Sequence, residues 1–266
     1  MGVGGMGIVF RAEDLQLKRQ IALKVMKPSA ASSRSARDRF LREAQATAAI
    51  DHHHIVAIHQ VGEDGNIPFI AMQYLRGESL QARLKREHQL SQPDVLRIGR
   101  EVASGLAAAH EQGLIHRDIK PDNIWIDEAT GWARILDFGL ARIATDDAGL
   151  TRSGIIVGTP RYMAPEQAQG DVVDHRCDLF SLGSVLYHLL AGRPPFRGRN
   201  VTATLIAVTQ EDPPALQAIN PALDQRLCDL IMSLLNKDPE QRPQKAQDVC
   251  DRLAEIEAAP LPAAIP

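Results

Sequence analysis

The side chains best suited to catalysis gather in one short segment, HRDIKPDN, at residues 116–123. Asp118 carries a carboxylate that could accept a proton from a hydroxyl group, and Lys120 could neutralise a moving phosphoryl group. Asn123 offers an amide oxygen, and the later segment DFG begins with the carboxylate of Asp137. Oxygen ligands of this kind suit Mg²⁺. One base beside one metal site is the equipment needed for phosphoryl transfer.

A second signal related to phosphate is the opening sequence, MGVGGMGIVF. Its pattern G-x-G-x-x-G runs through Gly2, Gly4 and Gly7, and fits a dinucleotide-binding turn, a hairpin laid over phosphates or a plain flexible loop. A dinucleotide-binding turn needs a helix after the loop, whereas the apolar run 8–10 favours a strand. The hairpin, with bare backbone amides as donors, is therefore favoured, although the loop alone does not exclude the other two.

Lys24 lies in the middle of an alternating segment, 21–26, that predicts a strand. A lysine at such a position usually faces solvent. Because this strand follows the glycine loop, Lys24 could instead point into a cleft and grip phosphate oxygens. It would then need an anion to hold it, and Glu43 on the predicted helix 35–50 is the natural candidate. The alternative for Glu43 is a solvated helix edge.

The remaining patterns predict a small strand-rich part followed by a large helical part. Strands are expected at 8–10, 55–61 and 67–74, and a loop at 29–35. After Gly77 the chain is expected to be mostly helical, with irregular sequence at 114–170. The helices predicted there span 91–113, 178–191, 201–210, 223–235 and 245–257. This order indicates two lobes with a cleft between them.

The composition excludes several broad classes of protein. With 266 residues the chain is long enough for a sizeable core. Its net charge of −3 gives no general electrostatic reason to expect nucleic acid or membrane surfaces as partners. No apolar run reaches about 18 residues, so no membrane span is expected. The three cysteines are far apart and form no C-x-x-C, which favours reduced thiols and a cytoplasmic location.

Seven segments, taken in order, resemble the motifs of the eukaryotic-like (Hanks-type) serine/threonine protein kinases, especially the bacterial branch. They are GVGGMGIVF, ALKVM, HRDIKPDN, DFGLAR, GTPRYMAPEQ, DLFSLGSVLYHLLAGRPPF and KDPEQRP. The resemblance covers about residues 2–255. It implies an α+β, two-lobed protein-kinase fold over 1–257, with a small antiparallel-sheet lobe at 1–74 and a larger, mainly helical lobe at 75–257. The Ala/Pro-rich tail 258–266 indicates a linker.

The resemblance also implies an activity, the transfer of the γ-phosphoryl group of ATP to serine or threonine hydroxyls of protein substrates. Asp118 would be the catalytic base and Lys120 would assist at the γ-phosphate. Lysine two residues after the base is the serine/threonine pattern, and Thr159 in GTPRY agrees. Asn123 and Asp137 would hold Mg²⁺, or Mn²⁺ in its place.

The resemblance assigns a further set of residues to the nucleotide. The glycine hairpin covers the phosphates, and Lys24 contacts the α- and β-phosphates while it pairs with Glu43. The hairpin residues are Gly2, Val3, Gly4, Gly5, Met6 and Gly7. The adenine pocket consists of the roof residues Val9 and Ala22, the gatekeeper Met72, the hinge residues Gln73 and Leu75, and Trp125.

Trp125 departs from the family pattern, because relatives usually have Leu or Met at this place, as the floor under adenine. Either the indole forms that floor and stacks on the base, or it packs on the surface of the lobe.

Two of the implied roles are structural. Glu166 would pair with Arg242 in a buried ion pair, and Asp178 would anchor the catalytic loop. Loss of either partner would leave a buried charge unpaired, at a cost of roughly 3–5 kcal/mol.

The resemblance also implies regulation by phosphorylation, because Arg117 directly precedes the base. Kinases with this arginine commonly require a phosphate in the activation segment, and Thr151 and Ser153 lie in that segment, 137–166. We expect autophosphorylation at one or both, in a transient homodimer, with the phosphate ordering the loop through Arg117. The alternative is a merely polar loop.

Three other interpretations compete with an active protein kinase. A pseudokinase scaffold usually loses part of the catalytic set, which is complete here, and a small-molecule kinase usually lacks the GTPRYMAPE platform. The third is an impaired kinase, because only Met1 precedes the first glycine, where the family has a full strand. We therefore expect a truncated first strand, an exposed sheet edge and weakened ATP binding, with upstream sequence missing. A membrane anchor following the tail in a longer protein is also expected from bacterial relatives.

Overall fold

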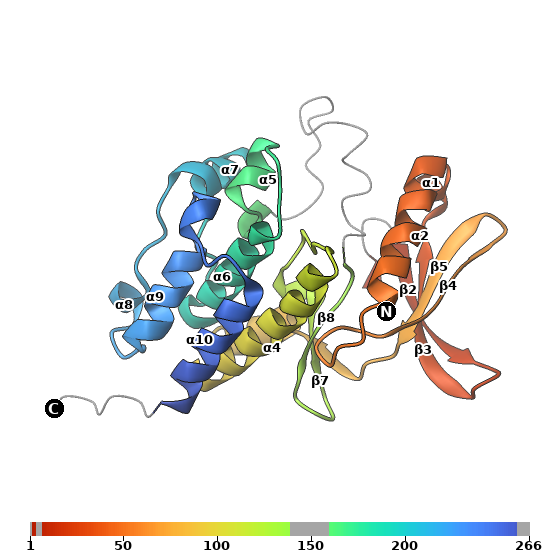
Figure 1. The fold of residues 1–266 in the computed structure, drawn as a ribbon, viewed down its shortest axis with the longest axis horizontal. Helices are drawn as coiled ribbons and strands as arrows, with labels where there is room; N and C mark the ends of the chain where they lie inside the picture. The colour runs from red at the N-terminus through yellow and green to blue at the C-terminus, as the bar shows by residue number, and fades with distance from the viewer. Residues whose placement is uncertain (1, 4–6, 139–159, 260–266) are drawn as a thin grey trace.

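In the computed structural model the chain forms two lobes, a small lobe built on an antiparallel sheet and a larger helical lobe (Figure 1). The structure describes residues 2–3, 7–138 and 160–259. This arrangement confirms the predicted α+β, two-lobed fold.

The sheet of the small lobe has five strands in the order β1-β2-β3-β5-β4, and all neighbours are antiparallel. The strands are β1 (Gly2–Val3), β2 (Gly7–Asp14), β3 (Arg19–Met26), β4 (Ile58–Asp64) and β5 (Ile67–Gln73). The first strand is short, as expected, but it is paired: Gly2 lies opposite Val9 and Val3 lies opposite Ile8. The described residues on the two sides of the glycine segment are therefore antiparallel neighbours in the sheet.

Helix α2 (Arg34–Ala48) packs on the sheet through its apolar stripe. The Oγ atom of Ser33 accepts a hydrogen bond from Ala36 N and so caps the first turn. Phe40 and Ala44 are buried against Met26 of β3 and Ile70 of β5. The predicted loop at 29–35 is wrong in part, because α1 (Pro28–Ala31) forms there and starts with proline in its first turn.

The larger lobe is built around α6 (Arg176–Ala191), which is buried over most of its length. At Gly183 an added Cβ atom would lie 2.6 Å from Leu234 Cβ, so glycine permits the close approach of α9 (Gln225–Leu234). The surrounding helices are α3 (Leu80–Glu87), α4 (Gln92–Glu111), α5 (Pro165–Gln169), α7 (Val201–Gln210), α8 (Leu216–Ile219), α9 (Gln225–Leu234) and α10 (Ala246–Ala258).

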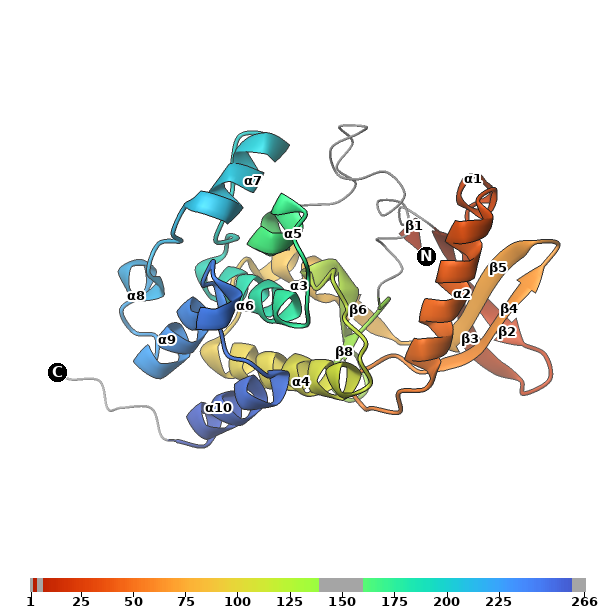
Figure 2. The same cartoon turned by 45° about the horizontal axis from the view of Figure 1, so that its top comes forward.

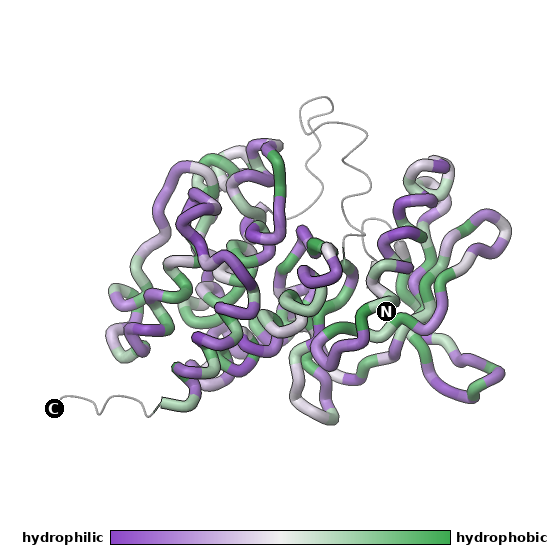
Figure 3. Tube along the Cα trace, viewed as in Figure 1, coloured by the Kyte–Doolittle hydropathy of each residue, from purple (hydrophilic) through white to green (hydrophobic). Residues whose placement is uncertain are grey.

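Figure 3 shows hydrophilic residues in the hairpin turns of the small lobe.

A second, three-stranded sheet lies between the two lobes (Figure 1). Its antiparallel strands are β6 (Gly77–Ser79), β7 (Ile124–Asp127) and β8 (Ala133–Ile135). The prediction of helix after Gly77 and of irregular structure at 114–170 is therefore wrong for β6, β7 and most of β8. The apolar pair Ile135-Leu136, ahead of DFG, predicts a strand, and Ile135 is the last residue of β8. Strands of three or four residues are too short to show a period of two, and only their tertiary partners reveal them.

Candidate active site

The catalytic loop brings together the three residues predicted to act on the acceptor and the phosphate. Lys120 Nζ lies 2.6 Å from Asp118 Oδ2, and Asn123 Nδ2 donates to the same oxygen at 2.9 Å. Asn123 Nδ2 also donates to the carbonyl oxygen of Asp118 at 2.8 Å. A 3-10 turn, Pro121–Asn123, folds the chain back so that these contacts form. Two side chains therefore hold the candidate base through one oxygen of its carboxylate, Oδ2.

Asp178, at the start of α6, fixes the loop through its backbone. Its Oδ2 accepts from His116 N at 2.8 Å, and its Oδ1 accepts from Arg117 N at 2.7 Å. His110 Nε2 lies 2.9 Å from Oδ2. Burial would raise the pKa of Asp178, but the hydrogen bond and charge of His110, together with the charge and backbone N–H of His116, outweigh burial and lower the pKa. These bonds hold Arg117 in a left-handed backbone conformation, φ 65°.

His116 connects the catalytic loop to the segment that carries Asp137. Its Nε2 donates to the carbonyl oxygen of Leu136 at 2.8 Å, and its ring meets Phe138 edge-on with centroids 4.8 Å apart. Its Nδ1 accepts from Asp118 N at 3.2 Å. The sequence analysis missed this role, although His116 stands inside the quoted HRDIKPDN motif.

Lys24 points inward from β3 and pairs with Asp137 across the two lobes. The ammonium nitrogen lies 2.8 Å from Asp137 Oδ1, and the two side chains are 10% and 31% exposed. Lys24 therefore does not face solvent. Glu43 lies half-buried on α2, and its pairing with Lys24 stays a prediction.

The oxygen atoms near the loop fit a hard divalent cation. Both hydrogens of the Asn123 amide nitrogen face Asp118 acceptors, which leaves the amide oxygen to serve as a ligand. Asp137 adds a carboxylate. In the described part of the chain no three His, Cys, Asp or Glu side chains form a metal cluster. A site of this kind suits Mg²⁺, which keeps waters and binds phosphates with few protein ligands.

The apolar residues predicted to surround adenine gather in one cluster between the lobes. Its buried members are Val56, Met72 and Leu75, and Val9, Ala22, Ile58, Trp125 and Leu136 pack against them. Trp125 Nε1 donates to the carbonyl oxygen of Arg76 at 3.2 Å, so its ring is oriented by the chain just beyond the hinge. Trp125 thus belongs to the cluster rather than to a separate surface patch. Gln73 is the last residue of β5 and lies outside this cluster, and its N–H donates to Ala57 O at 2.8 Å.

The two expected structural partners, Glu166 and Arg242, form a bidentate ion pair. Arg242 Nη1 and Nη2 donate to Glu166 Oε1 and Oε2 at 2.7 and 2.8 Å, and both side chains are buried. Gln167, the next residue of α5, donates from Nε2 to Arg117 O at 3.0 Å. Through this contact, which the sequence analysis missed, α5 supports the catalytic loop.

Some predicted residues lie outside the described part of the chain. These are Gly4, Gly5, Met6, Thr151 and Ser153. Gly2 and Val3 form β1, and Gly7 begins β2. At Gly7 an added Cβ atom would lie 2.8 Å from Val25 O, so only glycine lets the two strands approach so closely.

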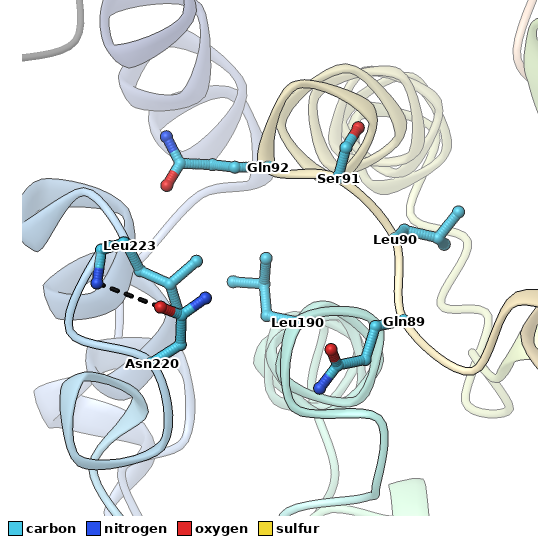
Figure 4. A pocket seen from close by; sticks show the side chains of 8 residues that line it. Gln89, Leu90, Ser91, Gln92, Leu190, Asn220 and Leu223 are labelled. Atoms are coloured by element: carbon cyan, nitrogen blue, oxygen red, sulfur yellow. Dashed lines mark hydrogen bonds between the residues drawn. The ribbon is translucent and has the colours of Figure 1, made fainter.

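A separate cavity of about 250 Å³ lies in the helical lobe, beside the loop between α3 and α4 (Figure 4). Leu90, Leu190 and Leu223 give it an apolar lining, and amide side chains such as Gln89 and Asn220 lie at its edge. None of its lining residues is charged, and none belongs to the catalytic loop. The cavity therefore contributes nothing to the candidate active site.

The protein kinase domain family matches residues 1–253. The chain belongs to this family. The kinase domain is 40% identical over 261 residues to the serine/threonine-protein kinase pkn3 of Myxococcus xanthus, covering 93% of this chain and 47% of the relative. It is 38% identical over 254 residues to PknB of Mycobacterium tuberculosis strain H37Rv, covering 94% of this chain and 40% of the relative. The chain thus spans less than half the length of these relatives.

Solved structures agree with this assignment. The crystal structure of the PknI kinase domain of Mycobacterium tuberculosis matches with a TM-score of 0.76 at 30% identity, over 97% of this chain and 94% of that chain. The family resemblance inferred from the motifs is therefore confirmed, together with the fold.

Proposed function

We propose that this chain is an active serine/threonine protein kinase, which transfers the γ-phosphoryl group of ATP to hydroxyl groups of protein substrates. The observation that carries the proposal is the hydrogen-bonded unit of Asp118, Lys120 and Asn123, anchored through the catalytic loop by buried Asp178. Kinase catalysis consists mainly of positioning and charge neutralisation, and this unit provides both. Relatives named as serine/threonine kinases support the choice of acceptor.

Each residue of the unit has a distinct task in the proposed reaction. Asp118 accepts the proton of the acceptor hydroxyl, and Lys120, 2.6 Å from it, neutralises charge on the transferred group. Asn123 and Asp137 hold Mg²⁺, which when bound neutralises the phosphate oxygens. Lys24 binds the α- and β-phosphates and pairs with Glu43 in the nucleotide-bound state.

The apolar cluster is the proposed adenine site. Val9 and Ala22 cover the base, Trp125 lies beneath it, and Met72 closes the rear. The backbone of Gln73 and Leu75 reads the edge of the base. An apolar cleft with a few polar groups is typical of such sites.

We also propose that activation involves autophosphorylation of Thr151 or Ser153 in a transient homodimer. Arg117 supports this idea, because its Nε is buried and has no hydrogen-bond partner among the described residues. A phosphate would satisfy this group and order the segment.

The extent and location of the domain are proposals as well. We assign residues 1–257 to the kinase domain and place it in the cytoplasm. Its three free cysteines, Cys177, Cys228 and Cys250, are consistent with a reducing compartment. Among the described helices none is long and apolar enough to cross a membrane.

Incubation of the wild-type protein with Mg²⁺ and ATP, followed by phosphosite mapping, tests the proposal. We expect phosphate on Thr151 or Ser153 in the wild type and none in Asp118→Asn. Phosphate on serine or threonine elsewhere would contradict the regulatory proposal alone. No phosphate transfer to the chain itself or to a generic serine/threonine substrate would contradict the kinase proposal.

A further inference from the structure

Helix α4 carries a buried carboxylate, Glu101, in the middle of its packed length. The residue is 4% exposed, and α4 lies beside β8 (Figure 2). Glu101 Oε2 accepts a hydrogen bond from Ala133 N, the first residue of β8, at 2.7 Å. A charge in such a place is costly unless it is paired and hydrogen-bonded, so its contacts indicate what it does.

Arg97 completes the pairing of this carboxylate, one helical turn earlier on α4. Its Nη1 lies 3.2 Å from Glu101 Oε2 and also donates to Gly131 O at 2.6 Å. Gly131 belongs to the turn that leads into β8. The ion pair therefore holds both the turn and the first residue of the strand.

The same strand is held from the other side by the loop after α2, which belongs to the small lobe. His54 Nδ1 donates to Ala133 O at 2.9 Å, so both backbone groups of Ala133 are bound by side chains. Ile135 N donates to His54 O at 2.8 Å, and Val56 N donates to Ile135 O at 3.0 Å. At this junction α4, the small-lobe loop and β8 meet.

The junction is closely packed. At Gly105, one turn beyond Glu101 on α4, an added Cβ atom would lie 3.1 Å from His54 O and 3.0 Å from Ile135 Cδ1. Ser104 Oγ lies 3.2 Å from His52 Nε2 in the same loop. The helix, the loop and the strand therefore have little freedom to move independently.

Strand β8 leads directly to the metal-binding segment. Leu136 N donates to Asn123 O at 2.8 Å, and Asp137 follows with a left-handed backbone, φ 53°. A non-glycine residue keeps such a conformation only when its surroundings impose it. The position of β8 thus fixes both oxygen ligands assigned to the metal.

We propose that Glu101 is a positioning residue for the binding of Mg²⁺-bound nucleotide. Glu101 acts on Asp137 through Ala133 and β8. The proposal rests on the proposed function, because that function assigns the metal to Asp137 and Asn123. A purely structural Glu101 would stabilise the fold without influence on the metal.

The test compares three variants with the wild-type protein. Glu101→Ala removes the acceptor, Glu101→Gln keeps an oxygen that can accept from Ala133 N, and Val249→Ala removes a buried contact between α10 and the core as a control for lost stability. Calorimetry measures the affinity for a non-hydrolysable ATP analogue with and without Mg²⁺. Thermal unfolding is recorded for each protein.

The gain in analogue affinity on addition of Mg²⁺ should fall by about threefold to tenfold in Glu101→Ala, at or below the lower end of the loss typical of groups bonded directly to a metal ligand, because Glu101 acts through Ala133 and β8. We expect Glu101→Gln to recover most of the gain and Val249→Ala to keep all of it. Affinity without Mg²⁺ should not change. If Glu101→Ala does not fold, His54→Leu, which frees Ala133 O instead, should show a smaller loss in the same direction.

An unchanged Mg²⁺-dependent gain in folded Glu101→Ala, or in His54→Leu in its place, would overturn the proposal, whatever the loss of thermal stability. An equal loss in Val249→Ala would also overturn it. A wild-type protein that gains affinity with Mg²⁺ but transfers no phosphate would contradict the proposed function. The positioning role would then still be decided by the Mg²⁺-dependent gain in analogue affinity of the variants.

Discussion

Lys24 Nζ and Asp137 Oδ1 lie 2.8 Å apart, one on β3 of the small lobe and the other after β8. The two residues are assigned to different parts of the bound nucleotide, Lys24 to its phosphates and Asp137 to its metal ion. In this structure they neutralise each other across the lobes. If the assigned roles hold, we expect binding of Mg²⁺ and ATP to replace this contact with contacts to phosphate and metal.

Substitution of Lys24 tests its assignment. Lys24→Met should lower kcat/KM for ATP by about 10²-fold or more, because a preorganised cation no longer meets the phosphates. Steady-state kinetics of phosphotransfer provide the measurement. Lys27→Met, three residues along the chain and outside the proposed site, is the matched control. Equal activity of the two variants would contradict the assigned role of Lys24.

Trp125 is expected to contact the adenine ring. Trp125→Leu should raise the KM for ATP by about twofold to twelvefold, which corresponds to the usual 0.5–1.5 kcal/mol of an aromatic pair. The chain has two tryptophans, and Trp132 packs instead against His53 and His54. A Trp132→Phe protein therefore reports on Trp125 alone, and its fluorescence should change when ATP binds. Unchanged fluorescence together with an unchanged KM in Trp125→Leu would exclude the contact.

Removal of one partner of the Glu166–Arg242 pair should lower the stability of the protein strongly. Arg242→Met leaves a buried carboxylate unpaired and should lower the free energy of unfolding by about 3–5 kcal/mol. Urea denaturation measures this change. Arg34→Ala is the control, because Arg34 and its partner Asp38 are 88% and 57% exposed, and its effect should stay within about 1 kcal/mol. Similar losses in both variants would show that burial of the ion pair has little effect on the free energy of unfolding.

His188 should make stability depend on pH. Burial, reinforced by the charge of Arg161, lowers its pKa to about 4, and the neutral ring lies 2.7 Å from the Tyr162 hydroxyl through Nδ1. Because the unfolded chain binds this proton more readily, stability due to this group is present above about pH 6.5 and is lost as pH falls toward 4.

Unfolding measured at pH 7 and pH 5 checks the role of His188. His188→Gln should lose less stability on acidification than the wild type, whereas His88→Gln, at an exposed position, should lose as much as the wild type. The same pH dependence in all three proteins would rule out the contribution of His188.

Elements with strong local signals were predictable from the sequence. The helix predicted over 91–113 is α4, capped by Ser91, and the predicted range 201–210 coincides with α7. The motifs also predicted the pairing partners Glu166 and Arg242 and the apolar residues around Trp125.

Features that depend on contacts between distant segments were not predictable in the same way. The strands β6 to β8 are defined by their partners, since each has only three or four residues. The contact of Lys24 with Asp137 depends on the relative position of the two lobes. Glu101 was missed because a glutamate inside a helix usually faces solvent, and only the structure places Ala133 N beside it.

The central claim is that Asp118 acts as the base in phosphoryl transfer from ATP to a protein hydroxyl. The most direct test is the kcat for phosphorylation of a generic serine/threonine substrate by the wild type, by Asp118→Asn and by Asp251→Asn, an exposed position on α10. We expect an active wild type, an unchanged Asp251→Asn and a loss of about 10²–10⁴-fold in Asp118→Asn. Equal rates in all three proteins would contradict the claim.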